Sequence, residues 1–271
     1  MRKTAGSPSI AYDSTPGGPG KPRVLLVMGF GMRGDVWKPQ IEGLGADHEL
    51  AWFDNRGIGK SDPPPRRFRM RDLALDALRV AEALGWARFH VVGVSLGGMV
   101  AQEIALAAPE RLFSLTLIAT HPGGPLGIAP HAKGLKHWVR AVFGPQEGRV
   151  ENLTELLYTP SFLSSIDQRE LKERMKLQVG AKPDPRTAAL QLLAVIRHDT
   201  RRRLHAIQAP TLVLKPESDI LVRPMHSDRL SRGIPGAKLV TLPDTGHGIT
   251  FQRKDRVNEE IRRHIADCSP A

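Results

Sequence analysis

Short apolar runs alternate with amphipathic segments along most of the chain. The apolar runs predict strands, and the segments with helical spacing predict helices. The strands are expected at 23–28, 49–54, 88–94, 112–119, 211–215 and 238–242. The helices are expected near 36–44, 70–84, 96–108, 223–232 and 251–265. Strands that alternate with helices form a mostly parallel sheet with helices on both faces, so the pattern predicts an α/β fold.

The alternation breaks after residue 120. Residues 121–205 are mainly helical in pattern and carry no strand signal. The alternation then resumes at Ala209-Pro210-Thr211. We therefore expect a core of residues 1–120 and 206–271, with a helical segment at 121–205 inserted between its two parts.

A serine between a predicted strand and a predicted helix is the first candidate for chemistry. Ser95 is the centre of Gly93-Val94-Ser95-Leu96-Gly97, which matches G-x-S-x-G. In this context the motif is typical of a nucleophile elbow, a sharp turn that lifts the hydroxyl above the sheet. The Leu96 N–H would then lie at a helix N-terminus, where it can stabilise an oxyanion. Glycine-rich turns also occur without catalysis, so the interpretation depends on a base and an acid elsewhere.

A base and an acid are present in the expected kind of position. A serine hydroxyl needs a base to take its proton and a carboxylate to orient that base. His247 follows the strand predicted at 238–242, and Asp219 follows the strand predicted at 211–215. Glu217 follows the same strand and remains a competitor, whereas Asp244 is expected to shape the turn before His247. The predicted catalytic residues are Ser95, Asp219 and His247.

Four segments resemble α/β-hydrolases of the esterase and enol-lactonase type. They are residues 24–31, residues 52–62, the elbow with its continuation to 111, and the pair Asp219 and His247. The resemblance implies an α/β-hydrolase fold in which 121–205 forms a lid over the serine. It also implies a carboxylic-ester hydrolase that acts on an ester or lactone through an acyl-enzyme, without cofactor or metal. The family's second oxyanion donor maps onto the backbone N–H of Phe30.

The resemblance leaves several points open. Met28 stands where many relatives have a histidine, which puts the packing of the oxyanion loop in question. The same fold also supports C–C bond hydrolysis, perhydrolysis and polyketide-tailoring esterases, because fold does not fix function. The aromatic residues of the insertion are candidates for the substrate pocket, although at least half are expected to be core: Trp138, Phe143, Tyr158 and Phe162.

A dinucleotide-binding oxidoreductase is the rival hypothesis. Residues 29–34 match G-x-G-x-x-G after a strand, and Asp54 follows Gly34 by twenty residues. However, Trp37 and Pro39 stand where the helix of such a motif should pack closely against the strand. The rival also leaves the serine, aspartate and histidine without a role. A non-catalytic binding protein on the same fold is a third hypothesis, which the complete set of three residues disfavours.

The formal net charge of +11 raises the question of nucleic-acid binding. The basic residues are spread over many segments, with the densest clusters at 66–71 and 201–203. No recognised nucleic-acid module accompanies them, so we expect small-molecule rather than nucleic-acid partners. Residues 121–205 hold fourteen Lys and Arg against eight Asp and Glu. This excess gives weak support to a carboxylate-bearing substrate, because solvated helix faces explain it equally well.

The remaining sequence features bear on the location of the protein and on metal binding. No apolar run reaches the ~18 residues that a membrane span needs, and no hydrophobic segment follows the basic residues at the start. Cys268 is the single cysteine, so no intrachain disulfide forms. Together these features favour a cytoplasmic protein without membrane partners. His131 and His137 have no metal-ligand spacing, so no metal site is predicted. The sequence does not indicate the oligomeric state.

Overall fold

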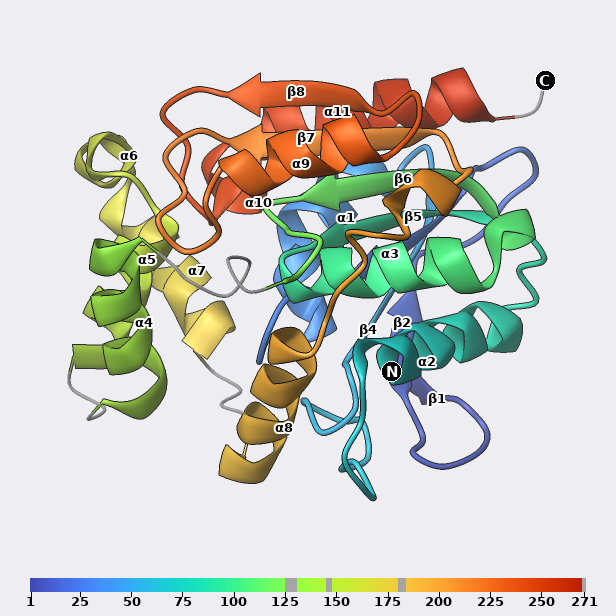
Figure 1. Cartoon of the computed structure of the whole chain (residues 1–271), viewed down its shortest axis with the longest axis horizontal. Coiled ribbons are helices and arrows are strands. Elements are labelled where there is room, and N and C mark those ends of the chain that lie inside the picture. Colours follow the sequence, from blue (N-terminus) through green and yellow to red (C-terminus); the bar gives the residue numbers. More distant parts are fainter. Residues whose placement is uncertain (125–130, 145–147, 180–183, 270–271) are drawn as a thin grey trace.

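One eight-stranded sheet runs through the middle of the molecule (Figure 1). The computed structural model describes residues 1–124, 131–144, 148–179 and 184–269. The strands lie in the order β1-β2-β4-β3-β5-β6-β7-β8. Their bounds are β1 (Arg2–Lys3), β2 (Ala11–Ser14), β3 (Arg23–Val27), β4 (Glu49–Phe53), β5 (Phe89–Val94), β6 (Leu112–Ile118), β7 (Thr211–Pro216) and β8 (Lys238–Leu242). The strands from β3 to β8 pair with one another in parallel, and β2 and then β1 extend the sheet in antiparallel fashion from β4.

Successive side chains of the central strands enter two different cores. In β3, Leu25 and Val27 belong to one hydrophobic cluster, and Val24 and Leu26 belong to another. This alternation follows from the two-residue period of a strand. Because both faces of the parallel strands are buried, they appear in the sequence as continuous apolar runs.

Helices cover both faces of the sheet. Residues of α2, α3 and α9 pack in the cluster that contains Leu25, and residues of α1 and α11 pack in the cluster that contains Val24. The predicted fold class is therefore confirmed. The helices of this core are α1 (Lys38–Leu44), α2 (Met70–Ala83), α3 (Leu96–Ala107), α9 (Met225–Gly233), α10 (Ile249–Gln252) and α11 (Lys254–Cys268).

A group of helices separates β6 from β7 in the sequence. They are α4 (Ala132–Phe143), α5 (Arg149–Leu157), α6 (Pro160–Ser165), α7 (Gln168–Val179) and α8 (Pro185–Ile196). In Figure 1, α4 to α7 gather on the side toward which the arrowheads of β6 and β8 point. The two ends of the inserted segment are joined, because Thr200 N donates a hydrogen bond to Pro122 O at 2.8 Å. The segment thus leaves and re-enters the core at one place, beside the carboxyl ends of the strands.

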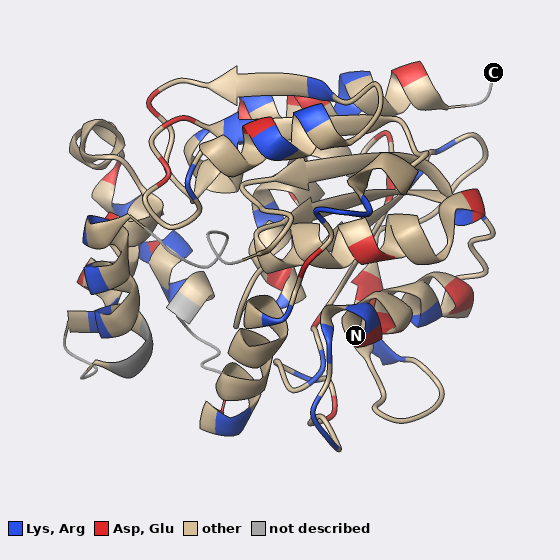
Figure 2. Ribbon diagram, in the orientation of Figure 1, with Lys and Arg blue, Asp and Glu red and all other residues tan. Residues whose placement is uncertain are grey.

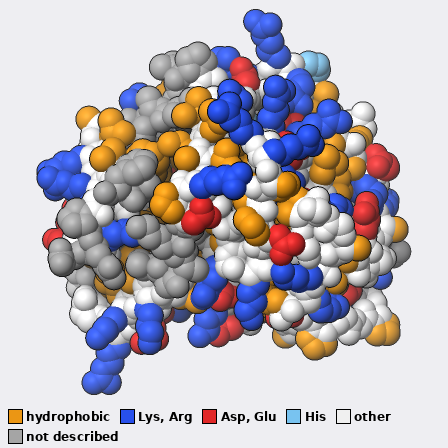
Figure 3. Space-filling view, turned by 90° about the horizontal axis from the view of Figure 1, so that it is seen from below, with side chains coloured by type: hydrophobic (Ala, Val, Ile, Leu, Met, Phe, Trp, Pro, Cys, Tyr) orange, Lys and Arg blue, Asp and Glu red, His pale blue; other side chains and the backbone are white. Residues whose placement is uncertain are grey.

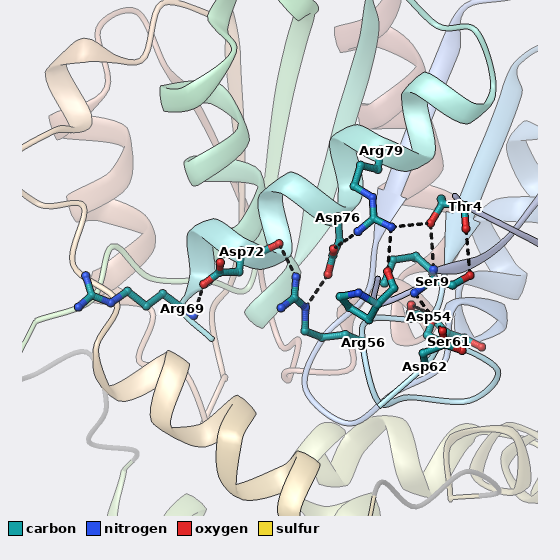
Figure 4. A network of polar contacts seen from close by, with 12 residues as sticks. Thr4, Ser9, Asp54, Arg56, Ser61, Asp62, Arg69, Asp72, Asp76 and Arg79 are labelled. Carbon is teal, nitrogen blue, oxygen red and sulfur yellow. Dashed lines mark hydrogen bonds and ion pairs between the residues drawn. The ribbon is translucent and has the colours of Figure 1, made fainter. Parts of the chain in front are cut away.

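A polar network ties the loop after β4 to α2 and to the N-terminal segment (Figure 4). Arg56 Nε donates to Asp76 Oδ2 at 2.7 Å, and Arg79 Nη1 donates to Asp76 Oδ1 at 3.1 Å. Arg79 Nη2 also donates to Pro8 O at 2.8 Å. Burial raises the pKa of the Asp76 carboxyl, against the lowering effect of Arg56. The network thus fixes the loop after β4 and the N-terminal segment against α2.

Charged residues are distributed over the whole fold (Figure 2). Lys and Arg alternate with Asp and Glu on the helices, and in the face of Figure 3 basic side chains stand among hydrophobic and acidic ones. The positive net charge is therefore not gathered on a single element. In the part of the chain that the structure describes, no helix combines the length and the apolar character that a membrane span requires.

Candidate active site

Ser95 occupies a sharp turn between β5 and α3. Its backbone has φ 56° and ψ −121°, a conformation that L-residues seldom adopt. Two hydrogen bonds hold the turn: Ser95 N donates to Ile118 O at 2.9 Å, and Thr120 Oγ1 donates to Ser95 O at 2.7 Å. The geometry is that of the elbow predicted from the sequence.

The glycines around the serine are required by close backbone approach. A Cβ atom at Gly97 would collide with the carbonyl of Val27, and one at Gly93 would collide with the carbonyl of Gly97. These contacts are with main-chain atoms, which cannot rotate away. The start of α3 can therefore lie directly against the end of β3, and this approach sets the position of Ser95.

His247 and Asp219 form a buried hydrogen-bonded pair. His247 Nδ1 and Asp219 Oδ2 are 2.7 Å apart. Asp219 Oδ1 accepts hydrogen bonds from Leu221 N and Val222 N, at 2.8 and 2.9 Å. The carboxylate is thus fixed on both oxygens, and one of them is aimed at the imidazole.

The alternative acids are placed differently. Glu217 is exposed, and its backbone N–H donates to Leu242 O. Asp244 has φ 45° and accepts a hydrogen bond from Ser161 Oγ at 2.5 Å. Asp244 therefore shapes its turn and contacts α6, while Asp219 is the carboxylate that bonds His247.

The loop after β3 lies against the serine. A Cβ atom at Gly29 would lie 3.3 Å from Ser95 Cβ. The loop is held by Gly31 N, which donates to Gln191 Oε1 of α8 at 2.9 Å. Among the described residues, no acceptor is found for the backbone N–H of Phe30 or of Leu96. Both amides are thus left without a described acceptor, one in the loop after β3 and one at the start of α3 directly after Ser95.

Met28, which stands where many relatives have a histidine, is buried at the start of this loop. Met28 is 4% exposed, and its carbonyl accepts a hydrogen bond from Asn55 Nδ2 at 3.3 Å. The loop is therefore anchored through its backbone, by Asn55 on one side and Gln191 on the other.

A cavity of about 580 Å³ lies between the carboxyl ends of the strands and the inserted helices. Ser95, His247 and Phe30 line it from the core. Apolar side chains of α4, α5 and α8 form a large part of the remaining wall, including Leu153, Leu156, Ala188, Leu192, Leu193 and Ile196. The enclosure is mainly hydrophobic, as is usual for small-molecule sites.

The four aromatic residues proposed for the pocket have different positions. Trp138 lines the cavity. Tyr158 and Phe162 do not contribute to this lining; their rings pack on each other and on Phe251, with centroids 5.4 to 6.0 Å apart. They form the small core that joins α5 and α6 to α10. Phe143 ends α4, and its side chain lies outside the described part of the structure.

Asp54, the residue that suggested a dinucleotide site, has a structural position. It is buried, and its carboxylate accepts hydrogen bonds from Gly34 N at 2.8 Å and Lys60 N at 2.9 Å. A short 3₁₀ helix follows the glycines at Gly34–Trp37, and α1 begins only at Lys38. The carboxylate is thus occupied in joining two loops of the core.

Three buried histidines lie close to one another. The ring of His121 is 5.6 Å from that of His226 and 6.4 Å from that of His198. Burial lowers the pKa of His121 to about 3 and that of His198 to about 4. Among the described residues, no group of His, Cys, Asp and Glu is arranged to hold a metal ion. We therefore regard His121 and His198 as neutral core residues.

Two polar residues of the inserted helices contact the site without having been predicted. Gln191 holds the loop after β3, and Arg174 of α7 lines the cavity. Both come from segments without a recognisable motif. The sequence does contain a sign of the unusual position of Arg174. This residue falls on the same helix face as Leu171, Met175 and Gln178, so a charged side chain stands on the buried side of the helix.

Comparison with known proteins agrees with the observed fold. A family model described as the alpha/beta hydrolase fold matches residues 22–254. The Azorhizobium caulinodans protein named "Putative carbamate hydrolase RutD" is 32% identical over 246 residues, which cover 90% of this chain and 91% of that protein. The Caulobacter vibrioides protein of the same name is 30% identical and covers 96% of this chain and 97% of its own.

Solved structures show the same similarity. A thermophilic esterase from Thermogutta terrifontis, with malate bound, has a TM-score of 0.82 at 26% identity, over the full length of both chains. The enol-lactonase from Burkholderia xenovorans LB400 also has a TM-score of 0.82, with 95% of this chain and 96% of that chain covered. Its identity of 22% supports a common fold only.

Proposed function

The chain belongs to the alpha/beta hydrolase fold family, and on this premise we propose that it is a serine hydrolase that cleaves a carboxylic ester or a lactone. Ser95 is the nucleophile, His247 the base and Asp219 the acid of the proposed triad. One observation carries the proposal. Ser95 is held in a strained turn on the wall of the cavity that His247 also lines, and Asp219 bonds Nδ1 of that imidazole.

The proposed mechanism follows from the hydrogen bond between His247 and Asp219. When Nδ1 donates to the carboxylate, a neutral imidazole has its lone pair on Nε2, the nitrogen left to accept a proton. Ser95 Oγ attacks the scissile carbonyl as Nε2 takes its proton. The carboxylate stabilises the imidazolium that forms, and the imidazolium then protonates the leaving alcohol.

The two backbone amides supply the electrostatic part of the mechanism. The N–H groups of Phe30 and Leu96 bind the oxygen on which negative charge develops. Water activated by His247 then hydrolyses the acyl-enzyme, which releases the acid and regenerates Ser95. We also propose that residues 121–205 act as a lid that selects the substrate, since their helices supply most of the cavity wall.

A carbamate is the second candidate substrate, because the curated relatives described above carry the name of a carbamate hydrolase. The same residues would act on it, through a carbamoyl-enzyme in place of the acyl-enzyme. Attack on a carbamate carbonyl is slower, because the nitrogen lone pair makes this carbonyl less electrophilic. The two candidates therefore differ in substrate and share the nucleophile.

The test is a substrate panel measured on the wild type and on Ser95→Ala. The panel contains p-nitrophenyl esters of graded acyl length, aliphatic and enol lactones, and matched aryl carbamates. We expect turnover of esters or lactones by the wild type and its loss in Ser95→Ala. Faster turnover of carbamates than of matched esters would favour the second candidate, and equal turnover by both proteins would contradict the mechanism.

A further inference from the structure

A buried arginine faces the same cavity as the proposed triad. Arg174 belongs to α7, lines the cavity and is only 6% exposed. Arg149 of α5 is a second arginine in the wall. Among the described residues, no Asp or Glu lines this cavity. The enclosure is thus apolar and positively charged.

The contacts of Arg174 leave its charge without a counterion. Nη1 donates to the backbone carbonyl of Val36 at 2.7 Å, and the guanidinium carbon lies 5.1 Å from the centre of the Phe251 ring. The phenol of Tyr158 is a polar neighbour, and Arg174 offsets part of the rise in its pKa that burial causes. Nε is buried and has no hydrogen-bond partner among the described residues.

An acidic residue of the same helix is already paired with another cation. Glu170 lies one helical turn before Arg174, and its Oε1 accepts a hydrogen bond from Lys254 Nζ at 2.9 Å. In the described part of the chain, no carboxylate lies within 4.0 Å of the Arg174 side chain. A buried charge without a partner is strongly unfavourable, so its presence in a cavity wall calls for an anion that enters the cavity.

The chemistry of the guanidinium narrows the kind of anion. Its planar set of N–H donors matches the two oxygens of a carboxylate. Val36 and Phe251 restrict the rotation of the side chain, so that little entropy is lost when an anion binds. The anionic group is separate from the scissile carbonyl, because a free carboxylate is a poor electrophile for serine.

We propose that Arg174 binds a substrate carboxylate remote from the scissile bond, so that the enzyme acts on anionic half-esters or on lactones that carry a carboxylate. This inference rests on the proposed serine hydrolase function. It extends that function by a substrate class and by the residue that recognises it. Arg174 orients the substrate and takes no part in the bond changes at Ser95.

The experiment compares p-nitrophenyl half-esters of succinic, glutaric and adipic acids with the corresponding p-nitrophenyl methyl diesters. We expect the wild type to prefer at least one half-ester over its neutral counterpart. Arg174→Met should lower that preference at least tenfold, mainly through a higher KM, and change kcat/KM for the neutral diester by less than threefold. Arg174→Lys should give an intermediate preference, because it keeps the charge but loses the planar donors.

The matched control is Lys176→Met. Lys176 is exposed on the same helix, and its substitution removes the same charge. Long-range steering by the net charge would respond alike to both changes, whereas a binding contact responds only to Arg174→Met. Retained turnover of the neutral diester also shows that Arg174→Met is folded.

Two results would overturn the inference. One is a wild type without any preference for a half-ester, and the other is an equal loss of both substrates in Arg174→Met. Calorimetric titration with succinate, glutarate and adipate tests binding separately from turnover, with at least tenfold weaker binding expected in Arg174→Met. If no ester is hydrolysed, the proposed function fails, and equal binding or none in both proteins then rejects the role of Arg174 as well.

Discussion

At the scale of single residues, the proposed mechanism depends on which nitrogen of His247 carries the proton. Asp219 bonds His247 Nδ1 and is itself held by two backbone amides. Its position is therefore independent of any substrate. The orientation of the imidazole is a property of the folded chain, which the substrate does not have to organise.

Replacing this carboxylate by its amide is expected to lower kcat by roughly 10⁴. In Asp219→Asn the side chain can donate a hydrogen bond to Nδ1, which would place the imidazole proton on Nε2 and remove the base. Glu217→Gln is the matched control, because Glu217 is exposed after the same strand. Steady-state kinetics with the best ester of the panel give the comparison. A large loss in Glu217→Gln with an active Asp219→Asn would reverse the assignment.

At the scale of elements, the site is assembled where neighbouring strands end. β3 and β5 are adjacent in the sheet, and the loops that follow them carry Phe30 and Ser95. The chain order of the strands reverses between β3 and β5, which is where open α/β sheets form their crevices. The inserted helix α8 completes the arrangement, since Gln191 fixes the backbone of the loop after β3.

Gln191→Leu tests this contact between an inserted helix and the loop. The substitution removes the acceptor for Gly31 N and lets the loop move relative to Ser95. We expect kcat to fall by about tenfold, which corresponds to about 1.4 kcal/mol of transition-state stabilisation. Gln168→Leu on the exposed start of α7 serves as the control. An unchanged kcat in Gln191→Leu would show that the loop is held sufficiently by Asn55 and its own turn.

The sequence allowed the prediction of those elements whose signals are local. The six parallel strands and the turn at Ser95 were predicted, since buried strands are continuous apolar runs and the elbow has its own motif. β1 and β2 were missed because they are short: β1 has only two residues, both exposed, and β2 has only four residues, too few for a periodic signal. The helix expected at 251–265 is divided into α10 and α11 at Arg253.

The missed residues of the site depend on long-range contacts. Gly31 and Gln191 are 160 positions apart, and Val36 and Arg174 are 138 positions apart. No pattern within a window of the sequence indicates that such residues meet. Ser95, Asp219 and His247 could be predicted because each follows a recognisable strand.

At the scale of the whole molecule, the stability of the fold depends on pH through buried histidines. His198 is 3% exposed, makes no hydrogen bond with the described residues and has its pKa lowered to about 4. Its unfolded form takes up a proton near pH 6.5, which the folded form resists until about pH 4. The unfolded state therefore binds more protons in this interval, and stability falls as the pH decreases through it.

His198→Leu should remove this part of the pH dependence. Between pH 7.5 and 5.0, the wild type should lose about 2 kcal/mol more unfolding free energy than the variant. Urea unfolding at the two pH values measures the difference. The exposed His205 provides the control substitution, His205→Leu. Parallel losses in the wild type and His198→Leu would show that other groups govern the acid sensitivity.

The central claim is that Ser95 is the nucleophile, and covalent labelling tests it without knowledge of the natural substrate. Wild-type protein and Ser95→Ala are treated with a fluorophosphonate and analysed by intact-protein and peptide mass spectrometry. The account predicts one adduct per wild-type chain, located on Ser95, and none on Ser95→Ala, together with a loss of kcat on the order of 10⁶. Labelling of Ser95→Ala at the wild-type rate, or a wild-type adduct on another residue, would contradict it.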